Sequence, residues 1–216
     1  MVGLIRNKIT IQPKEFDKEE RKKQIKAVSD FCEAIENGQR RNISFNKISP
    51  KPAHFKEESK EEDDWLLKNW GTRFNALNAC WISDDEIIFD TMWNPAIPIF
   101  IKIAEHFPDI RFIFQFASKH TGRKAGEIEA EGGEITDFTW FEDYSLESYE
   151  TAFELMPHLQ VLYTLNMRTG TFVYDTSDFQ AQIAQNGFYK DSDGCVLIGC
   201  DDKNKPLFDS ADDLPF

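Results

Sequence analysis

Residues 69–75 read Asn-Trp-Gly-Thr-Arg-Phe-Asn and residues 87–95 read Ile-Ile-Phe-Asp-Thr-Met-Trp-Asn-Pro, and these two segments carry the clearest structural signals in the chain. Between them, residues 83–85 read Ser-Asp-Asp, a composition typical of the tight turn that joins two antiparallel strands. We therefore predict strands at about 74–82 and 86–91. Two tryptophans and a Gly-Thr pair in so short a span indicate a fixed local structure around this hairpin.

The flanking sequence places this hairpin within an alternation of strands and helices. Apolar residues at helical spacing predict a helix over about 17–37, with Asp17 as its N-cap and Asn37-Gly38 as its end. The other elements expected before residue 141 are a strand at 4–12, a strand at 43–46, a short helix capped by Asp63 or Asp64 and ending near Trp70, a helix starting at Asn94-Pro95, a buried strand at 110–117, and a hairpin of strands 126–131 and 134–140 around Gly132-Gly133.

This order, β-α-β-β-α-β with an added hairpin, predicts an α+β fold of the ferredoxin-like type, with helices on one face of an antiparallel sheet. We expect this domain to occupy residues 1–140 and an α+β extension packed on it to occupy 141–216. The extension should contain a helix from Ser145 to Met156, a hairpin of strands 159–165 and 171–174, a helix from Ser177 or Asp178 to Asn186-Gly187, a strand at 195–199, a turn at 201–204 and an acidic tail at 209–216.

Composition narrows the class of protein. Of 216 residues, 41% are hydrophobic and 13% aromatic, enough to bury a core. No apolar run is long enough for a membrane helix, and the N-terminus lacks the apolar segment of a signal peptide. We expect a soluble, cytoplasmic protein that does not bind membranes.

Charge is distributed unevenly along the chain. Residues 1–60 carry 14 Lys and Arg against 9 Asp and Glu, whereas residues 61–216 carry 11 against 29. No Lys or Arg lies between Lys124 and Arg168, a span that contains ten acids. Such a surface repels nucleic acid. It is either a solvated, solubilising face or a surface that docks on a basic protein partner. The residues expected to form this acidic face are Glu127, Glu129, Glu131, Glu134, Glu142 and Asp143.

Motifs for catalysis and for cofactors are missing from the sequence. The four cysteines, Cys32, Cys80, Cys195 and Cys200, include no Cys-x-x-Cys pair, and the four histidines show no metal-ligand spacing. The sequence contains no phosphate-binding glycine loop and no nucleophile elbow. We therefore predict no metal and no cofactor, and we favour a non-enzymatic protein.

Three segments of this sequence read Trp-Gly-Thr-Arg-Phe-Asn-Ala at residues 70–76, Phe-Asp-Thr-Met-Trp-Asn-Pro-Ala at residues 89–96 and Phe-Pro-Asp at residues 107–109. They resemble the YubB-type ferredoxin-like domain family of phages, plasmids and bacterial genomes. The family pattern W-G-T-K-W-N-A corresponds to residues 70–76, F-D-T-A-W-S-P-P to residues 89–96, and F-P-D to residues 107–109. Departures are Arg73, Phe74, Met92 and Asn94-Pro95-Ala96 in place of Lys, Trp, Ala and Ser-Pro-Pro. The resemblance covers about residues 4–140 and implies a ferredoxin-like fold in a bacterial protein associated with a mobile element. It implies no catalytic residue.

The candidate binding residues are Trp70, Arg73, Asn75, Asp90 and Trp93. One interpretation is structural: Gly71 adopts a positive φ, the indoles fill a corner of the core, and Asp90 pairs with Arg73 across the hairpin. The other is a pocket or docking corner lined by Trp70, Arg73 and Trp93, since aromatic and Arg side chains dominate binding surfaces.

We therefore expect an interaction module that docks a protein partner through its acidic face or its aromatic corner. One alternative is an acidic DNA mimic that inhibits a nucleic-acid-binding protein. The other is a small-molecule-binding or enzymatic domain that uses Trp70, Arg73, Asp90 and Trp93.

Overall fold

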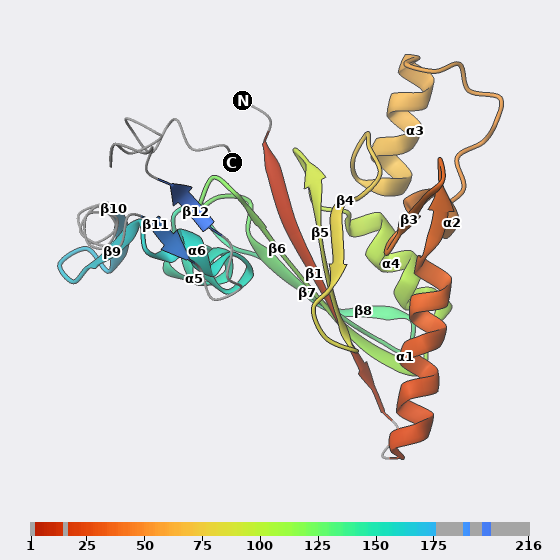
Figure 1. Ribbon diagram of the computed structural model, residues 1–216, viewed down its shortest axis with the longest axis horizontal. Coiled ribbons are helices and arrows are strands. Elements are labelled where there is room, and N and C mark those ends of the chain that lie inside the picture. The colour runs from red at the N-terminus through yellow and green to blue at the C-terminus, as the bar shows by residue number, and fades with distance from the viewer. Residues whose placement is uncertain (1–2, 15–16, 176–187, 191–195, 200–216) are drawn as a thin grey trace.

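The computed structural model describes residues 3–14, 17–175, 188–190 and 196–199, and its centre is a six-stranded antiparallel sheet (Figure 1). The strand order is β4 (Leu77–Trp81), β5 (Glu86–Met92), β1 (Leu4–Pro13), β6 (Ile110–Ser118), β7 (Gly126–Glu131) and β8 (Glu134–Trp140). The first four of these strands, with three helices between β1 and β4 and one helix between β5 and β6, form the ferredoxin-like arrangement. The β7–β8 hairpin extends the sheet beyond β6.

Helices cover one face of this sheet because its strands alternate apolar and polar side chains. In β1, Ile5, Ile9 and Ile11 are buried, while Arg6 and Lys8 point to the other face. Helices α1 (Lys18–Cys32), α2 (Phe45–Ile48), α3 (Lys60–Trp70) and α4 (Ile97–His106) lie on the apolar side (Figure 1). Phe112, Phe114 and Phe116 of β6 are fully buried there, so these rings belong to the core.

Helix α1 is shorter than the predicted helix over 17–37. Asp17 caps it as expected, accepting hydrogen bonds from the Glu19 and Glu20 amides, but the helix ends at Cys32. Asn37 and Gly38 both have positive φ, at 50° and 75°, and form a two-residue turn between β2 (Ala34–Glu36) and β3 (Gln39–Arg41). This turn geometry favours a hairpin over further helix.

Three other helix starts differ from prediction. The prediction of a strand at 43–46 is wrong. The side chain of Ser44 accepts a hydrogen bond from the Lys47 amide and caps α2, which begins at Phe45. Ser59, not Asp63 or Asp64, caps α3. Asn94 does not cap α4, which begins after Ala96 without a side-chain cap.

The C-terminal elements are α5 (Leu146–Leu155), α6 (Pro157–Gln160), β9 (Tyr163–Asn166), β10 (Thr171–Tyr174), β11 (Phe188–Lys190) and β12 (Val196–Gly199). Of these, α5 packs against β6 and β1 on the face of the sheet opposite α1–α4, and β9 and β10 contact α6 and α5 (Figure 1). Ser145 caps α5 as predicted, whereas Leu159 lies in α6 rather than in the expected strand, because Pro157 starts a helical turn. The helix predicted after Ser177 or Asp178, the turn at 201–204 and the tail at 209–216 lie outside the described residues.

A second hydrophobic cluster joins this C-terminal part to the sheet. It combines Ala117 of β6 and Ala125 with Tyr149, Phe153 and other apolar residues of α5 and α6. The carbonyl of Gly122, in the loop between β6 and β7, accepts hydrogen bonds from the Tyr144 amide and the Ser148 hydroxyl. The domain boundary at residue 140 stays a prediction. No helix in the described part of the chain has the length and apolar character needed to cross a membrane.

Candidate functional site

The Trp-Gly-Thr segment after α3 is built to hold the loop that follows β5. Gly71 ends α3 with a φ of 82°, and a Cβ placed there would lie 2.6 Å from the carbonyl oxygen of Pro95 and 2.9 Å from Cδ of Pro98. Only glycine permits both this conformation and this close approach. Thr72, fully buried, donates from Oγ1 to the carbonyl oxygen of Met92 at 3.0 Å. The two segments quoted first are therefore one local structure.

Trp93 stands at the centre of this structure in a left-handed backbone conformation, with φ of 65°. Its amide donates to the carbonyl oxygen of Gly3 at 2.6 Å, and its own carbonyl oxygen accepts from Nζ of Lys124 at 2.7 Å. Thr91 donates from Oγ1 to the carbonyl oxygen of Asn94 at 2.7 Å. A bulky residue rarely adopts positive φ, and it does so only where its surroundings enforce it.

The buried side-chain amide of Asn7 holds the same loop against the sheet. Asn7 of β1 is fully buried, and its Nδ2 donates to Oγ1 of Thr91 at 3.0 Å and to the carbonyl oxygens of Ile5 and Phe89. Its Oδ1 accepts from the Ala96 amide, the N-cap residue of α4, at 3.4 Å. Because a buried amide left without partners is costly, Asn7 fixes the positions of the loop and of α4 relative to the sheet.

These contacts hold an aromatic pair, Phe74 and Trp93, at the surface. The rings of Phe74 and Trp93 lie 6.0 Å apart between centroids, and the two residues are 47% and 43% exposed. We call these two residues the Phe74–Trp93 surface. Arg73 next to it is half-exposed and pairs with Asp63 of α3 at 3.2 Å. The sequence indicated Trp93 but not Phe74, which reads there as an ordinary strand residue.

Trp70 does not contribute to this surface. It is 6% exposed, packs edge-on against Phe45 and Trp65 in the main core, and donates from Nε1 to the carbonyl oxygen of Ser49 at 2.8 Å. Asn75 is likewise structural: its Oδ1 accepts from the amides of Phe45 and Ala76. These contacts tie Trp70 and Asn75 to α2 and α3 and place neither residue on the Phe74–Trp93 surface.

Asp90 lies on the opposite sheet face from Trp70, and it does not pair with Arg73. This fully buried carboxylate accepts from Nε of Arg6 at 2.7 Å, from Nζ of Lys119 at 3.2 Å and from Nδ2 of Asn78 at 3.0 Å. Burial alone would raise the pKa of Asp90, but the charge and hydrogen bonds of Arg6, with help from Asn78 and Lys119, lower it. The structure therefore does not gather Trp70, Arg73, Asp90 and Trp93 into one pocket.

The acidic residues fall into two groups. Strand pairing places Glu127, Glu129, Glu131, Glu134 and Asp137 on the polar side of the β7–β8 hairpin. Some are matched by bases: Glu129 contacts Arg111 at 2.5 Å, and Glu131 contacts Lys14 at 2.7 Å. Glu142 and Asp143 instead lie in the loop before α5, where Asp143 accepts from the Lys124 amide.

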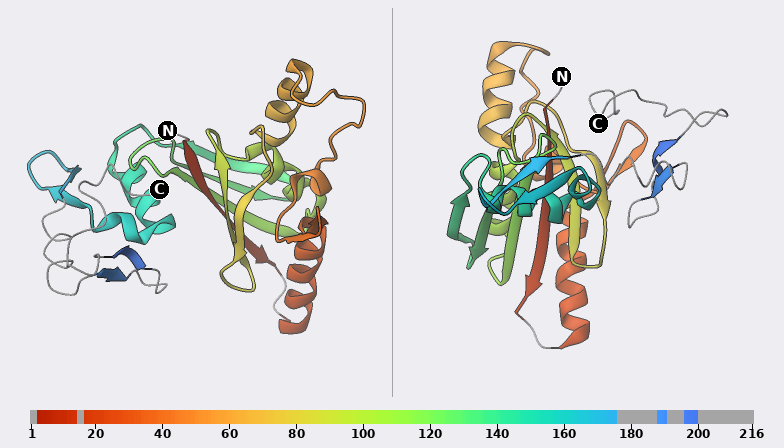
Figure 2. Two further views of the ribbon diagram at one scale, coloured as in Figure 1. Left: turned by 45° about the horizontal axis from the view of Figure 1, so that its top comes forward. Right: turned by 90° about the vertical axis from the view of Figure 1, so that its left-hand side faces the viewer.

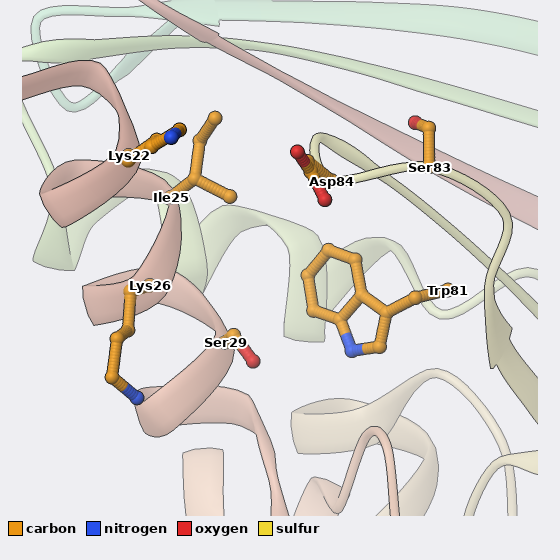
Figure 3. A pocket seen from close by; sticks show the side chains of 7 residues that line it. All are labelled: Lys22, Ile25, Lys26, Ser29, Trp81, Ser83 and Asp84. Atoms are coloured by element: carbon orange, nitrogen blue, oxygen red, sulfur yellow. The ribbon is translucent and has the colours of Figure 1, made fainter. Parts of the chain in front are cut away.

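A groove that the sequence did not indicate lies between α1 and the β4–β5 turn (Figure 3). It has a volume of about 360 Å³, in the lower range of small-molecule sites. Its lining residues are Lys22, Ile25, Lys26 and Ser29 from α1 and Trp81, Ser83 and Asp84 from the hairpin. Nε1 of Trp81 and Oγ of Ser29 both donate to Glu33, so these polar groups already have partners within the protein.

Metal ligands do not converge within the described residues, where no group of three or more His, Cys, Asp or Glu side chains could hold an ion. Among the same residues Cys32 is buried and Cys80 exposed, and both are free thiols.

Comparisons with known proteins bear on the fold. Residues 69–158 match the family model described as "Ferredoxin-like domain in Api92-like protein". No curated protein matches. Among solved structures, protein api92 from Yersinia pseudotuberculosis is similar with 13% identity and a TM-score of 0.33, over 40% of this chain. The similar part spans about a third of that structure, 32% of its chain. The part of this chain that holds the segments around Trp70 and Trp93 is thus similar to a ferredoxin-like domain of Api92-like proteins.

Proposed function

We propose that this protein is a non-enzymatic interaction module that docks a protein partner through the Phe74–Trp93 surface. The observation that carries this proposal is the backbone of Trp93, held at a φ of 65° while the residue remains 43% exposed. A left-handed conformation costs a tryptophan about 1–2 kcal/mol. If the Trp93 ring served only to fill the core, we would expect it to be buried, as the ring of Trp70 is.

The chemistry of the surface suits a protein partner. Aromatic and Arg side chains are enriched among the residues that dominate protein interfaces, and a rigid ring loses little conformational entropy on binding. Arg73, half-exposed beside the two rings, adds a charged hydrogen-bond donor at the rim. The resemblance to YubB-type domains supports placing the module in a bacterial mobile element.

The two alternatives are less well supported. A small-molecule or enzymatic site made of Trp70, Arg73, Asp90 and Trp93 has lost its basis, because Trp70 and Asp90 lie on opposite faces of the sheet. A DNA mimic needs unpaired acids, yet Glu129 and Glu131 are paired with Arg111 and Lys14.

The test is capture of partners by tagged protein from a nuclease-treated lysate of its host, followed by binding measurements with the purified partner. Trp93→Gly removes the ring and the strain together, and Phe74→Ser removes the second ring. Met167→Ala serves as the matched control, because Met167 is 86% exposed and lies in the β9–β10 turn.

We expect a stoichiometric partner that binds wild type and Met167→Ala equally and loses at least about tenfold in affinity for either surface variant. Undiminished binding of both surface variants, with their folds intact by circular dichroism, would refute the proposal.

A further inference from the structure

Strand β8 is an open edge of the sheet. It is the last strand in the order, and no other described strand pairs with its outer side. All seven of its residues, 134–140, are exposed. The β7–β8 hairpin lies at one edge of the sheet in the right-hand view of Figure 2. The outer main-chain amides and carbonyls of such a strand are available to another extended chain.

The two sides of β8 have different chemistry. Ile135, Phe138 and Trp140 pair in register with Ala130, Ile128 and Gly126, so their side chains share the helix-covered side of the sheet. They are 39%, 53% and 48% exposed and form a row of apolar groups along the edge. Glu134 and Asp137 pair with Glu131 and Glu129, and these acids share the polar side.

The acids of β8 lack bases of their own. Arg111 and Lys14 engage Glu129 and Glu131, but no ion pair among the described residues involves Glu134 or Asp137. The whole span from Ala125 to Met167 contains no Lys or Arg. Exposed edge strands commonly carry Lys or Pro, which discourage pairing, and β8 carries neither.

We propose that β8 binds an extended basic segment of a partner protein as a seventh strand, with apolar and basic side chains alternating along that segment. Strand addition joins main-chain groups, and side chains at every second position then decide specificity. In a continuous antiparallel sheet the apolar residues of such a segment would lie beside Ile135, Phe138 and Trp140. Its Lys or Arg residues would lie beside Glu134 and Asp137.

A second copy of this chain is a poor occupant of the same edge. Antiparallel pairing of β8 with itself keeps both strands' polar sides on one face of the joined sheet, so Glu134 and Asp137 would lie against the same acids of the other copy. Like charges directly opposite each other destabilise strand pairing. The charge of β8 therefore favours a basic partner over self-association.

The probe for the test is a fluorescein-labelled peptide as long as β8, 7 residues, with alternating lysine and valine and blocked ends. Its binding to the full-length protein is followed by fluorescence anisotropy at low and moderate salt. A matched peptide carries prolines in place of two central valines, which keeps its charge but blocks main-chain pairing. A third peptide replaces every lysine with glutamate.

Three variants of the protein separate strand addition from general attraction of a basic peptide to an acidic protein. Glu134→Lys/Asp137→Lys reverses the charge of β8, and Phe138→Thr interrupts its apolar row. Glu57→Lys/Asp64→Lys makes the same change in net charge at two exposed positions outside the sheet.

We expect the lysine–valine peptide to bind wild type and Glu57→Lys/Asp64→Lys alike, and to lose about tenfold or more in affinity for Glu134→Lys/Asp137→Lys. Phe138→Thr should weaken binding severalfold, and the other two peptides should not bind. Equal binding of the proline peptide, or equal weakening by both charge reversals, would overturn strand addition. Binding unchanged by Trp93→Gly would show that this edge acts independently of the Phe74–Trp93 surface.

Discussion

Thr72 and Met92 are joined by a hydrogen bond from the threonine hydroxyl to the main-chain carbonyl at 3.0 Å, which ties the end of α3 to the end of β5. Thr72 is fully buried, and without its hydroxyl the Met92 carbonyl oxygen would keep only the hydrogen bond from the Asn94 amide, at 2.8 Å. We expect Thr72→Val to lower the free energy of unfolding by about 1 kcal/mol, the net contribution of one hydrogen bond, and Thr72→Ser to cost less because it keeps the donor. Urea denaturation of both variants measures the difference, and an equal loss in the two would contradict this role.

Gly71 is expected to tolerate no side chain. Gly71→Ala forces a Cβ toward the Pro95 carbonyl oxygen at a positive φ, and we expect a loss of about 3 kcal/mol in unfolding free energy. Gly132→Ala is the control: its φ of 68° is similar, but no atom lies within 4 Å of the new Cβ, so backbone strain alone should cost about 1 kcal/mol. Thermal or urea unfolding that ranks the two variants equally would contradict the close approach.

The strain at Trp93 predicts an unusual order of stabilities. Glycine adopts a φ of 65° freely, whereas alanine keeps the penalty that tryptophan bears. We expect Trp93→Gly to be more stable than Trp93→Ala by about 1 kcal/mol, the reverse of the order usual in strands and helices. Chemical denaturation of both variants measures the difference in their unfolding free energies. A more stable alanine variant would mean that the left-handed conformation is not retained in solution.

The Asp90 cluster predicts a pH-dependent contribution to stability. Since the pKa of Asp90 is lowered from its ordinary value of 3.8, the folded state binds its proton less readily than the unfolded state does. Its contribution is fully present above about pH 4 and is lost as the pH falls through the lowered pKa. We expect Asp90→Asn to cost about 2 kcal/mol at pH 7, where it leaves Arg6 and Lys119 without a counter-charge.

The difference between wild type and Asp90→Asn should shrink below pH 4, and denaturation measured at a series of pH values checks this. A difference that is constant down to pH 2 would show that the charge of Asp90 contributes nothing.

The two described cysteines should react very differently. Burial raises the pKa of the Cys32 thiol to about 12, whereas Cys80 is exposed on β4. Because the thiolate is the reactive form, iodoacetamide at pH 8 should modify Cys80 and spare Cys32 until denaturant is added. Peptide mapping by mass spectrometry distinguishes the two sites, and early labelling of Cys32 would indicate that α1 opens readily.

The main sheet could be predicted from sequence because local signals and packing agree there. Alternating Phe112, Phe114 and Phe116 indicated β6, and Gly132-Gly133 fixed the β7–β8 hairpin at the residues observed. Prediction failed where two local signals competed. An Asn-Gly pair can end a helix or form the turn of a hairpin, and Asn37-Gly38 forms the turn of the β2–β3 hairpin. A serine can cap a helix or continue a strand, and Ser44 caps α2.

The candidate site was harder to predict because burial depends on distant elements. Trp70 and Trp93 occupy similar sequence contexts, yet Trp70 is buried and Trp93 is exposed. Trp70 is buried because it packs against Phe45 of α2 and Trp65 of α3. The pairing of Asp90 with Arg6 and Lys119 depends on the order of strands, which brings β1 rather than α3 beside β5. No spacing in the chain encodes such a contact.

The carbonyl oxygen of Gly122 has a consequence for dissecting this protein. It lies in the loop between two sheet strands, yet its donors are the Tyr144 amide and the Ser148 hydroxyl of the segment that begins α5. The ring of Tyr149 also fills the space where a side chain on Gly122 would stand, with Cζ 2.7 Å from that point. A fragment cut at residue 140 would strip this loop of both donors and of its aromatic cover. We therefore expect the sheet and α5 to unfold together, and shortened versions for crystallisation or binding work should retain the chain through α6.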